Sequence, residues 1–385
     1  MVTPTFLKVY FIFLIWEKIM NDLYLNFQDA YMDNGKEFLV SSNLCNGLFC
    51  VKENENRYIG SFYNKHIDIQ YLHKAIYLDK NDLLFIPTYG NEIDLYNVFT
   101  KEFGVIIPKY KINDLTTVNI ILDRKILFIP RTLGVDLCIF DIIDRTFERH
   151  SWWGTVTSAL GIKYTDASLF YCTEYSGNIY LPLRGYNVIL EVDLNNREII
   201  EHVINIDNAM PYSIDFYENK AWITQENSKT IICWDCINGS FTEFENNCEN
   251  IEENYIPYIK TVFLNNKAIF IPRNHSIFLI IDLISGETSS IDINKKNVNV
   301  NKNMNSTVWF YGYQIIKDKL ILFPSNTDKI LILDVKNKNI EWKKTGSISK
   351  NELLEYQLCN RNAEILYESE IINCKEWIFG IMKMD

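Results

Sequence analysis

The stretch VFLNNKAIFIPRNHSIFLIIDLISGETSSIDI, residues 262–293, consists of short apolar runs separated by polar residues. Two asparagines separate the first run from the second, Pro272 ends the second run, and a Ser-Gly pair follows the third. Runs of β-branched and aromatic residues separated by such turn residues are typical of antiparallel hairpins. The stretch therefore predicts a meander of short antiparallel strands.

The same pattern recurs along the chain, and two anchor positions mark it. The first anchor ends the second strand of each unit and recurs every 42 to 52 residues, at Ser41, Pro87, Pro130, Pro182, Thr224, Pro272 and Pro324. The second anchor ends the third strand, at Val51, Asn97, Asp141, Asp193, Asp235, Asp282 and Asp334. The offset between the anchors is always 10 or 11 residues, which is typical of repeats with variable connections. We expect the aspartates to cap turns at the strand ends.

The repeats define seven four-stranded units, near residues 23–64, 70–107, 117–152, 168–205, 212–245, 259–293 and 311–345. No segment other than Ser349 to Gln357 shows helical periodicity, which argues against crossover helices and a parallel sheet. A series of antiparallel units has exposed edges, and radial closure protects them. We therefore predict an all-β fold, a single β-propeller of four-stranded antiparallel blades over residues 23–385. A hairpin at 364–382 either closes a ring of seven blades or begins an eighth, and we favour seven.

Residues 1–22 are expected to form a strand or an N-terminal extension that is not native, with translation starting at Met20. The apolar run Phe6 to Trp16 is shorter than the roughly 20 residues that span a bilayer. A degenerate signal peptide over residues 1–19 is the alternative, and it would make the protein secreted. Nine scattered cysteines do not resemble a disulfide framework, so we expect a reducing compartment, the cytoplasm.

The repeat resembles the β-propeller superfamily of kelch, NHL, quinoprotein-type and WD40 repeats over residues 23–345. No single family is matched: a kelch Gly-Gly pair does not occur, and Trp234-Asp235 is the one Trp-Asp pair. LILDVKNKNIEWK, residues 331–343, is similar to a quinoprotein blade. AWITQENSKTIICWDCINGSFTEF, residues 221–244, is similar to blades of the streptogramin lyase. The resemblance implies the fold and no catalytic residue.

Charge and motifs restrict the function. The formal net charge of −11 argues against a nucleic-acid partner. The histidines have no metal-binding spacing, and no nucleophile elbow, phosphate-binding loop or dinucleotide motif occurs, so we expect no metal and no cofactor. Cys233 and Cys236 have the spacing of a redox or metal motif. Because they lie on a predicted strand three positions apart, their sulfurs should face opposite sides.

The rim formed by the loops after the second strands is the candidate site. Three arginines at near-equivalent positions, Arg131, Arg184 and Arg273, should converge there, and arginine can bind carboxylate or phosphate bidentately. Trp152 and Trp153 could stack on a ligand. The candidate list also includes Tyr89, Gln225, Glu226, His275 and Asn326. Alternatively, the arginines pair with neighbouring acids and the tryptophans fill a blade junction. Three longer connections, 152–166, 246–258 and 294–308, are polar insertions that could carry recognition.

Two functional hypotheses follow. The first is a non-enzymatic, monomeric binding propeller that recognises a protein, a small anionic ligand or a glycan on this rim. The second is a lyase or hydrolase acting on a glycan or peptide, with Glu226 or His275 as acid or base beside the arginines.

Overall fold

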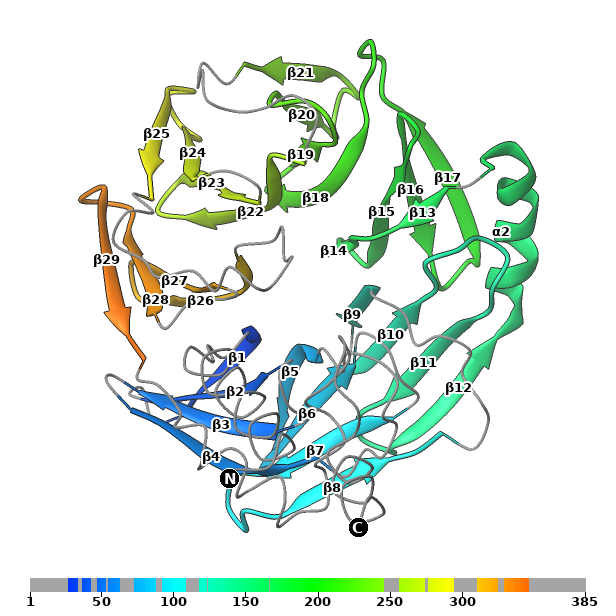
Figure 1. The fold of residues 1–385 in the computed structure, drawn as a ribbon. Coiled ribbons are helices and arrows are strands. Elements are labelled where there is room, and N and C mark those ends of the chain that lie inside the picture. The colour runs from blue at the N-terminus through cyan, green and yellow to red at the C-terminus, as the bar shows by residue number, and fades with distance from the viewer. Residues whose placement is uncertain are drawn as a thin grey trace, which may run out of the picture.

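The computed structural model describes residues 27–33, 37–42, 47–52, 55–62, 73–87, 92–108, 118–122, 124–165, 167–245, 256–273, 276–293, 310–324 and 329–345. The described strands form seven antiparallel sheets, and the sheets are arranged as blades in a ring (Figure 1). The predicted all-β propeller of seven four-stranded blades is confirmed. Residues 1–22 and the hairpin predicted at 364–382 lie outside the described residues.

Each blade is formed by consecutive strands, and its first strand lies nearest the centre of the ring (Figure 1). Blade 1 contains β1 (Phe27–Asp33), β2 (Glu37–Ser42), β3 (Gly47–Lys52) and β4 (Glu55–Ser61). Blade 2 contains β5 (His73–Asp79), β6 (Asp82–Pro87), β7 (Ile93–Asn97) and β8 (Phe103–Ile106). Blade 3 contains β9 (Val118–Leu122), β10 (Lys125–Ile129), β11 (Leu137–Asp141) and β12 (Thr146–His150).

Blade 4 has a divided inner strand and contains β13 (Ser168–Leu169), β14 (Thr173–Tyr175), β15 (Asn178–Arg184), β16 (Val188–Asp193) and β17 (Glu198–Val203). Blade 5 contains β18 (Pro211–Tyr217), β19 (Lys220–Gln225), β20 (Ile231–Asp235) and β21 (Phe241–Phe244). Blade 6 contains β22 (Tyr258–Leu264), β23 (Lys267–Pro272), β24 (Ile277–Asp282) and β25 (Thr288–Asp292). Blade 7 contains β26 (Phe310–Ile316), β27 (Lys319–Pro324), β28 (Lys329–Asp334) and β29 (Asn339–Lys344).

The core is divided among the interfaces between blades. Seven buried hydrophobic clusters fill the seven spaces between neighbouring blades. Successive residues of a strand point to opposite faces, so Leu39 packs toward blade 2 while Val40 packs toward blade 7. Cys233 and Cys236 likewise belong to different interfaces, which confirms that this pair is split between two faces.

The ring closes between blade 7 and blade 1. Phe38 of β2 and Phe323 of β27 meet edge to face with their ring centres 5.1 Å apart. The Gln314 side-chain amide on β26 donates a 2.6 Å hydrogen bond to the Ala30 carbonyl on β1. Within the described strands, side-chain packing therefore joins the first and last blades, and no sheet is shared between them.

One rim of the ring is built from a repeated turn between the third and fourth strands. In blade 6 the Asp282 carboxylate accepts backbone N–H bonds from the residues two and three positions later, both at 3.0 Å. The equivalent bonds occur at Asn97, Asp141, Asp193, Asp235 and, from the residue three positions later, Asp334. The prediction that these side chains cap turns is confirmed.

The proline anchors of blades 2, 4, 6 and 7 lie where the neighbouring inner strand is irregular. Proline has no N–H, so in a central strand it is tolerated beside a bulge. In blade 6, Pro272 pairs with Tyr258 at the edge of a register shift that bulges Ile259. In blade 4 the irregularity is larger: β13 ends opposite Leu183 and β14 begins opposite Tyr180, so residues 170–172 leave the sheet beside Pro182.

The connection between blades 3 and 4 corrects a prediction. Residues 152–166 were expected to form a polar insertion, but Ser151–Lys163 form helix α2 at the outer margin of the ring (Figure 1). Trp153, Gly154 and Thr157 face the protein, a contact too narrow to produce helical periodicity in the sequence. Gly154 allows a close approach, because a Cβ there would lie 2.3 Å from Asp136 Oδ1. Most of the other two insertions lies outside the described residues.

Candidate functional site

Phe170 lies at the centre of the candidate site and holds two arginines. It belongs to the segment 170–172 that leaves blade 4 between β13 and β14. The Arg131 guanidinium carbon lies 4.3 Å from the centre of the Phe170 ring, and the Arg184 guanidinium carbon lies 4.7 Å from it. A guanidinium over an aromatic face is attracted electrostatically and keeps its N–H edge available. The bulge in blade 4 therefore brings arginines of blades 3 and 4 together.

The loop that carries Arg131 is held from two sides. The Leu169 N–H donates a 2.8 Å bond to the Arg131 carbonyl, which ties this loop to the inner strand of blade 4. Behind the loop, the Gly134 N–H donates a 2.9 Å bond to Thr157 Oγ1 of α2. The helix thus braces the loop from the outside of the ring.

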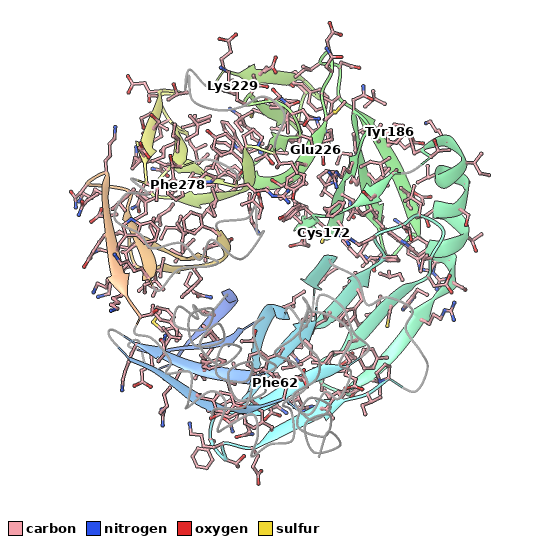
Figure 2. The ribbon with its side chains drawn as sticks, viewed as in Figure 1. Phe62, Cys172, Tyr186, Glu226, Lys229 and Phe278 are labelled. Atoms are coloured by element: carbon pink, nitrogen blue, oxygen red, sulfur yellow. The ribbon has the colours of Figure 1, made fainter. Side chains whose placement is uncertain are left out.

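Glu226 provides the carboxylate of the site. It follows β19, its N–H donates a 2.7 Å bond to the Met210 carbonyl, and its carboxylate forms an ion pair with Arg184 Nε. The Glu226 side chain is 9% exposed, whereas that of Arg184 is 41% exposed. Burial raises the pKa of Glu226, and the charges of Arg184 and Arg273 oppose this rise. Figure 2 shows Glu226 on the inner side of the ring.

Arg273 is held by an aromatic residue of the neighbouring blade. Its Nη1 donates a hydrogen bond to the Tyr212 hydroxyl, and its guanidinium carbon lies 5.3 Å from the centre of the Tyr212 ring. Tyr212 is the bulged residue of β18, and its ring also packs against Tyr171 with centres 4.9 Å apart. Arg273 Nε is buried and makes no hydrogen bond within the part of the chain that the structure describes.

We call these six residues, Arg131, Phe170, Arg184, Tyr212, Glu226 and Arg273, the arginine cluster. The cluster brings three guanidinium groups and one carboxylate together in a chain whose net charge is −11. The aromatic faces hold arginines and so are not open platforms for a stacked ligand ring. Chemically, the cluster is suited to binding an oxyanion at the guanidinium edges.

The other predicted site residues are not part of the arginine cluster. Gln225 is buried, and its amide donates to Thr230 Oγ1 at 2.6 Å and accepts from the Met210 N–H at 3.4 Å, so it holds the loop that carries Glu226. Trp153 is 1% exposed in the cluster between blades 3 and 4, and Trp152 packs against the same cluster. The helix directs both rings into the blade junction, as the alternative interpretation had it. Tyr89, His275 and Asn326 lie outside the described residues.

Sequence analysis missed the aromatic half of the cluster. Phe170 and Tyr171 fall within the unit predicted at 168–205 and Tyr212 begins the unit predicted at 212–245, and none of the three was a candidate site residue. The available signal was Pro182, which lies inside β15 of blade 4 and two positions before its end, whereas the anchor prolines of β6, β23 and β27 end their strands. A proline inside a central strand requires an irregular partner, and the partner here is 170–172.

A second charged group joins the inner strands of three blades. Lys260 Nζ of β22 lies 3.7 Å from Asp215 Oδ1 of β18 and 5.5 Å from the centre of the Tyr313 ring of β26. The other Asp215 oxygen accepts a 2.9 Å bond from the Thr261 N–H. Burial raises the pKa of Asp215 to about 6, although Lys260 opposes the rise.

Two further findings concern the described residues alone. No three side chains of His, Cys, Asp or Glu come together there in an arrangement that would hold a metal ion. No helix there is long and apolar enough to cross a membrane.

Solved structures share the fold. The extracellular domain of a protein described as a hybrid two-component system from B. thetaiotaomicron matches with a TM-score of 0.57 and 10% identity over 81% of this chain. The chain spans 38% of the length of that domain. A streptogramin B lyase matches with a TM-score of 0.56 and 11% identity, covering 84% of this chain and 96% of the lyase.

The WD40 β-propeller domain of Doa1 matches with a TM-score of 0.52 and 11% identity, covering 82% of this chain and 94% of that domain. No family model and no curated protein sequence matches this chain. At these identities the likeness establishes the propeller fold, and the function has to be inferred from the site.

Proposed function

We propose that this protein is a non-enzymatic binding propeller that recognises an anionic group of a protein or small ligand through Arg131, Arg184 and Arg273. A propeller fold is consistent with a role as a binding scaffold. The proposal goes further and assigns the recognition to the arginine cluster. It also takes the protein to act as a monomer, with no nucleic-acid partner.

The observation that supports this proposal is the convergence of three arginines from blades 3, 4 and 6 on two aromatic rings and one carboxylate. Arginines held side by side on aromatic rings attract an anion, and an incoming oxyanion would accept hydrogen bonds from their guanidinium edges.

The test is capture of partners from native lysate by wild-type protein and by the variant Arg131→Ala/Arg184→Ala/Arg273→Ala, with proteins and small molecules identified by mass spectrometry. The matched control is Arg124→Ala/Arg149→Ala/Arg197→Ala, which removes the same charge from exposed positions outside the cluster. A partner lost in the first variant and retained in the control is expected. Identical capture by all three proteins would overturn the proposal.

The second candidate is a lyase or hydrolase acting on a glycan or peptide at the same cluster. Glu226 favours it, because a buried carboxyl with a raised pKa beside arginines is suited to proton transfer. Substrate screening tests it: Glu226→Gln should abolish turnover and leave ligand binding intact. Turnover that persists in Glu226→Gln would remove Glu226 from the catalytic role.

We also propose a reducing compartment, the cytoplasm. The five cysteines that the structure describes, Cys50, Cys138, Cys172, Cys233 and Cys236, are free thiols, which supports this placement. Counting thiols in protein isolated under alkylating conditions tests it: nine free thiols are expected, and oxidised cysteines would contradict it.

A further inference from the structure

The rim that carries the turns between the third and fourth strands exposes an apolar side chain at one repeated position. In blade 2 the residue two positions after the capping side chain is Phe99, which is 82% exposed. The same position holds an isoleucine in blades 3, 5 and 6, and these three side chains are between 53% and 80% exposed. We call the four residues the tip residues: Phe99, Ile143, Ile237 and Ile284.

The turn itself does not require an apolar side chain at the tip. What the tip residue contributes to the turn is its backbone N–H, which donates to the capping side chain at 2.9 to 3.0 Å. Asn195 of blade 4 donates the same bond at 2.8 Å and has a polar side chain, and Lys336 occupies this position in blade 7. The contact with the core comes from the residue before the tip, as Ile142 is buried beside the exposed Ile143. Single exposed apolar residues are ordinary, but their recurrence at one position indicates an interaction surface.

The tip residues are spread around the ring. Blades 2 and 3, which carry two of them, lie across the ring from blades 5 and 6, which carry the other two (Figure 1). The binding energy of a protein interface is concentrated in a central cluster of side chains, and tip residues on both sides of the ring do not form such a cluster. The boundary of a lipid bilayer is flat and apolar, so it can take up all four side chains at once.

The charges of this rim favour an anionic bilayer. Because successive strands run in opposite directions, the turns between the first and second strands lie on the same rim as the tip residues. Among the described residues of both sets of turns, basic side chains outnumber acidic ones, whereas the whole chain has a net charge of −11. The basic residues are Lys80, Lys101, Arg124, Arg145, Arg197, Lys317, Lys336 and Lys338, and the acidic residues are Glu102, Asp144, Glu218, Glu287 and Asp318.

The capping aspartates add negative charge to this rim, and lysines offset it. In blades 3, 5, 6 and 7 a lysine of the second strand lies directly opposite the capping aspartate: Lys125, Lys220, Lys267 and Lys319. Salt screens exposed charges over about 8–10 Å, so a bilayer at the tips interacts with this rim more than with acidic residues elsewhere on the protein. Lysine and arginine side chains near an anionic lipid surface are attracted to it.

We propose that this protein docks on the surface of an anionic lipid bilayer through Phe99, Ile143, Ile237 and Ile284, with the basic turn residues facing the lipid headgroups. The contact lies on the membrane and does not span it. This inference does not depend on the proposed function. Because the arginine cluster lies on the opposite rim, a docked protein would keep that cluster open to solution.

The test is co-sedimentation of the full chain with vesicles of phosphatidylcholine alone and of phosphatidylcholine with about 30% phosphatidylserine. Wild-type protein should bind the anionic vesicles roughly tenfold or more tightly than the neutral ones, and added salt should weaken this binding. The variant Phe99→Asn/Ile143→Asn/Ile237→Asn/Ile284→Asn should bind the anionic vesicles roughly tenfold or more weakly than wild type. Asparagine is chosen because Asn195 occupies the tip of the same turn in blade 4.

The matched control is Ile107→Asn/Ile162→Asn/Ile200→Asn/Val203→Asn, which removes four exposed apolar side chains outside the turns and should bind as wild type does. A variant with a gain of binding keeps the test independent of lost stability. Asn195→Ile adds a fifth tip residue and should raise the affinity for anionic vesicles about threefold or more.

Three results with vesicles would overturn this inference: wild-type protein that does not prefer anionic vesicles, equal binding by wild type and a folded variant without the four tip residues, or no gain in Asn195→Ile. Melting temperatures show whether each variant is folded. Analytical ultracentrifugation without vesicles tests the competing occupant. A dimer that forms in wild type and dissociates when the tip residues are replaced would assign them to a second copy of the chain, and would also overturn it.

Discussion

The two rims of the ring differ in how they use the repeat. One rim carries the turns between the third and fourth strands. In blades 2 to 7 an Asn or Asp side chain caps this turn by accepting backbone N–H bonds. On the rim that carries the arginine cluster, the residue at the end of the second strand or just after it is an arginine in blades 3, 4 and 6 and a glutamate in blade 5. The turn caps serve the fold in six blades, whereas the candidate site is built from a position that only some blades use for charged side chains.

The inner strands show the same contrast. β22 of blade 6 is continuous and bulges by one residue opposite Pro272, whereas blade 4 releases three residues beside Pro182. Phe170 comes from this larger irregularity. We therefore expect substitutions at the cluster to change binding and substitutions at the turns to change stability, and four predictions test this division.

The largest expected effect is loss of anion binding in Phe170→Ala. Removing the ring takes away the aromatic face that orients the guanidinium groups of Arg131 and Arg184, so the oxyanion affinity should fall by tenfold or more while the melting temperature changes little. Phe99→Ala is the control, because Phe99 is 82% exposed on the opposite rim. Unchanged affinity for inorganic phosphate in Phe170→Ala would show that the ring does not position the arginines.

The second prediction concerns Asp215, which lies between the two rims on β18. Its folded pKa of about 6 exceeds the unfolded value, so its contribution to stability is complete below about pH 4 and is lost as the pH rises through 6. In wild type this amounts to on the order of 2 kcal/mol. The difference in unfolding free energy between pH 5 and pH 7, measured by denaturant unfolding, should be smaller in Asp215→Asn than in wild type. An identical pH dependence would place the titrating group elsewhere.

The third prediction separates the rims directly. Asp282→Ala should lower the melting temperature by a few degrees, since two backbone N–H groups and Lys267 lose their acceptor, and anion affinity should not change. Asp282→Asn should retain most of the stability, because Asn97 accepts the same two bonds in blade 2. A drop in anion affinity in Asp282→Ala would contradict the division of roles.

The smallest expected effect is that of substitutions at the positive-φ residue of the same turns on the free energy of unfolding. The fifth turn residue has positive φ in each of these blades: it is glycine at Gly286, with φ of 73°, and lysine at Lys338, with φ of 51°. Gly286→Ala should cost about 1 kcal/mol of unfolding free energy, and Lys338→Gly should gain a few tenths. Both are measured by denaturant unfolding. Effects of the same sign would show that neighbouring contacts outweigh backbone strain.

Much of the fold was predictable, because the two anchors express physical requirements of every blade. Asp282 and its equivalents mark a turn that needs an acceptor, and Pro272 marks a strand end beside a bulge. These requirements are local, so they recur at fixed offsets in the sequence. Helix α2 was not predictable this way, since its contact with the protein involves too few positions to produce periodicity.

The site was predictable in part. The three arginines and Glu226 follow from the position of the loops after the second strands, because the geometry of a propeller brings those loops to one rim. The roles of Phe170 and Tyr212 depend on where inner strands bulge, and a bulge is decided by pairing between strands. Trp152 and Trp153 are residues of a type that can stack on a ligand, but helix α2 packs both against the core between blades 3 and 4.

The junction between blades 7 and 1 has a mechanical consequence. Six of the seven junctions are crossed by the chain itself, whereas Phe38, Phe323 and the bond from Gln314 to Ala30 hold the seventh among the described residues. Tension applied at β1 and β29 would act on this junction, and no covalent link between the described residues of blades 7 and 1 would share the force. We therefore expect the ring to open first between blades 7 and 1, while the other six interfaces between blades stay packed.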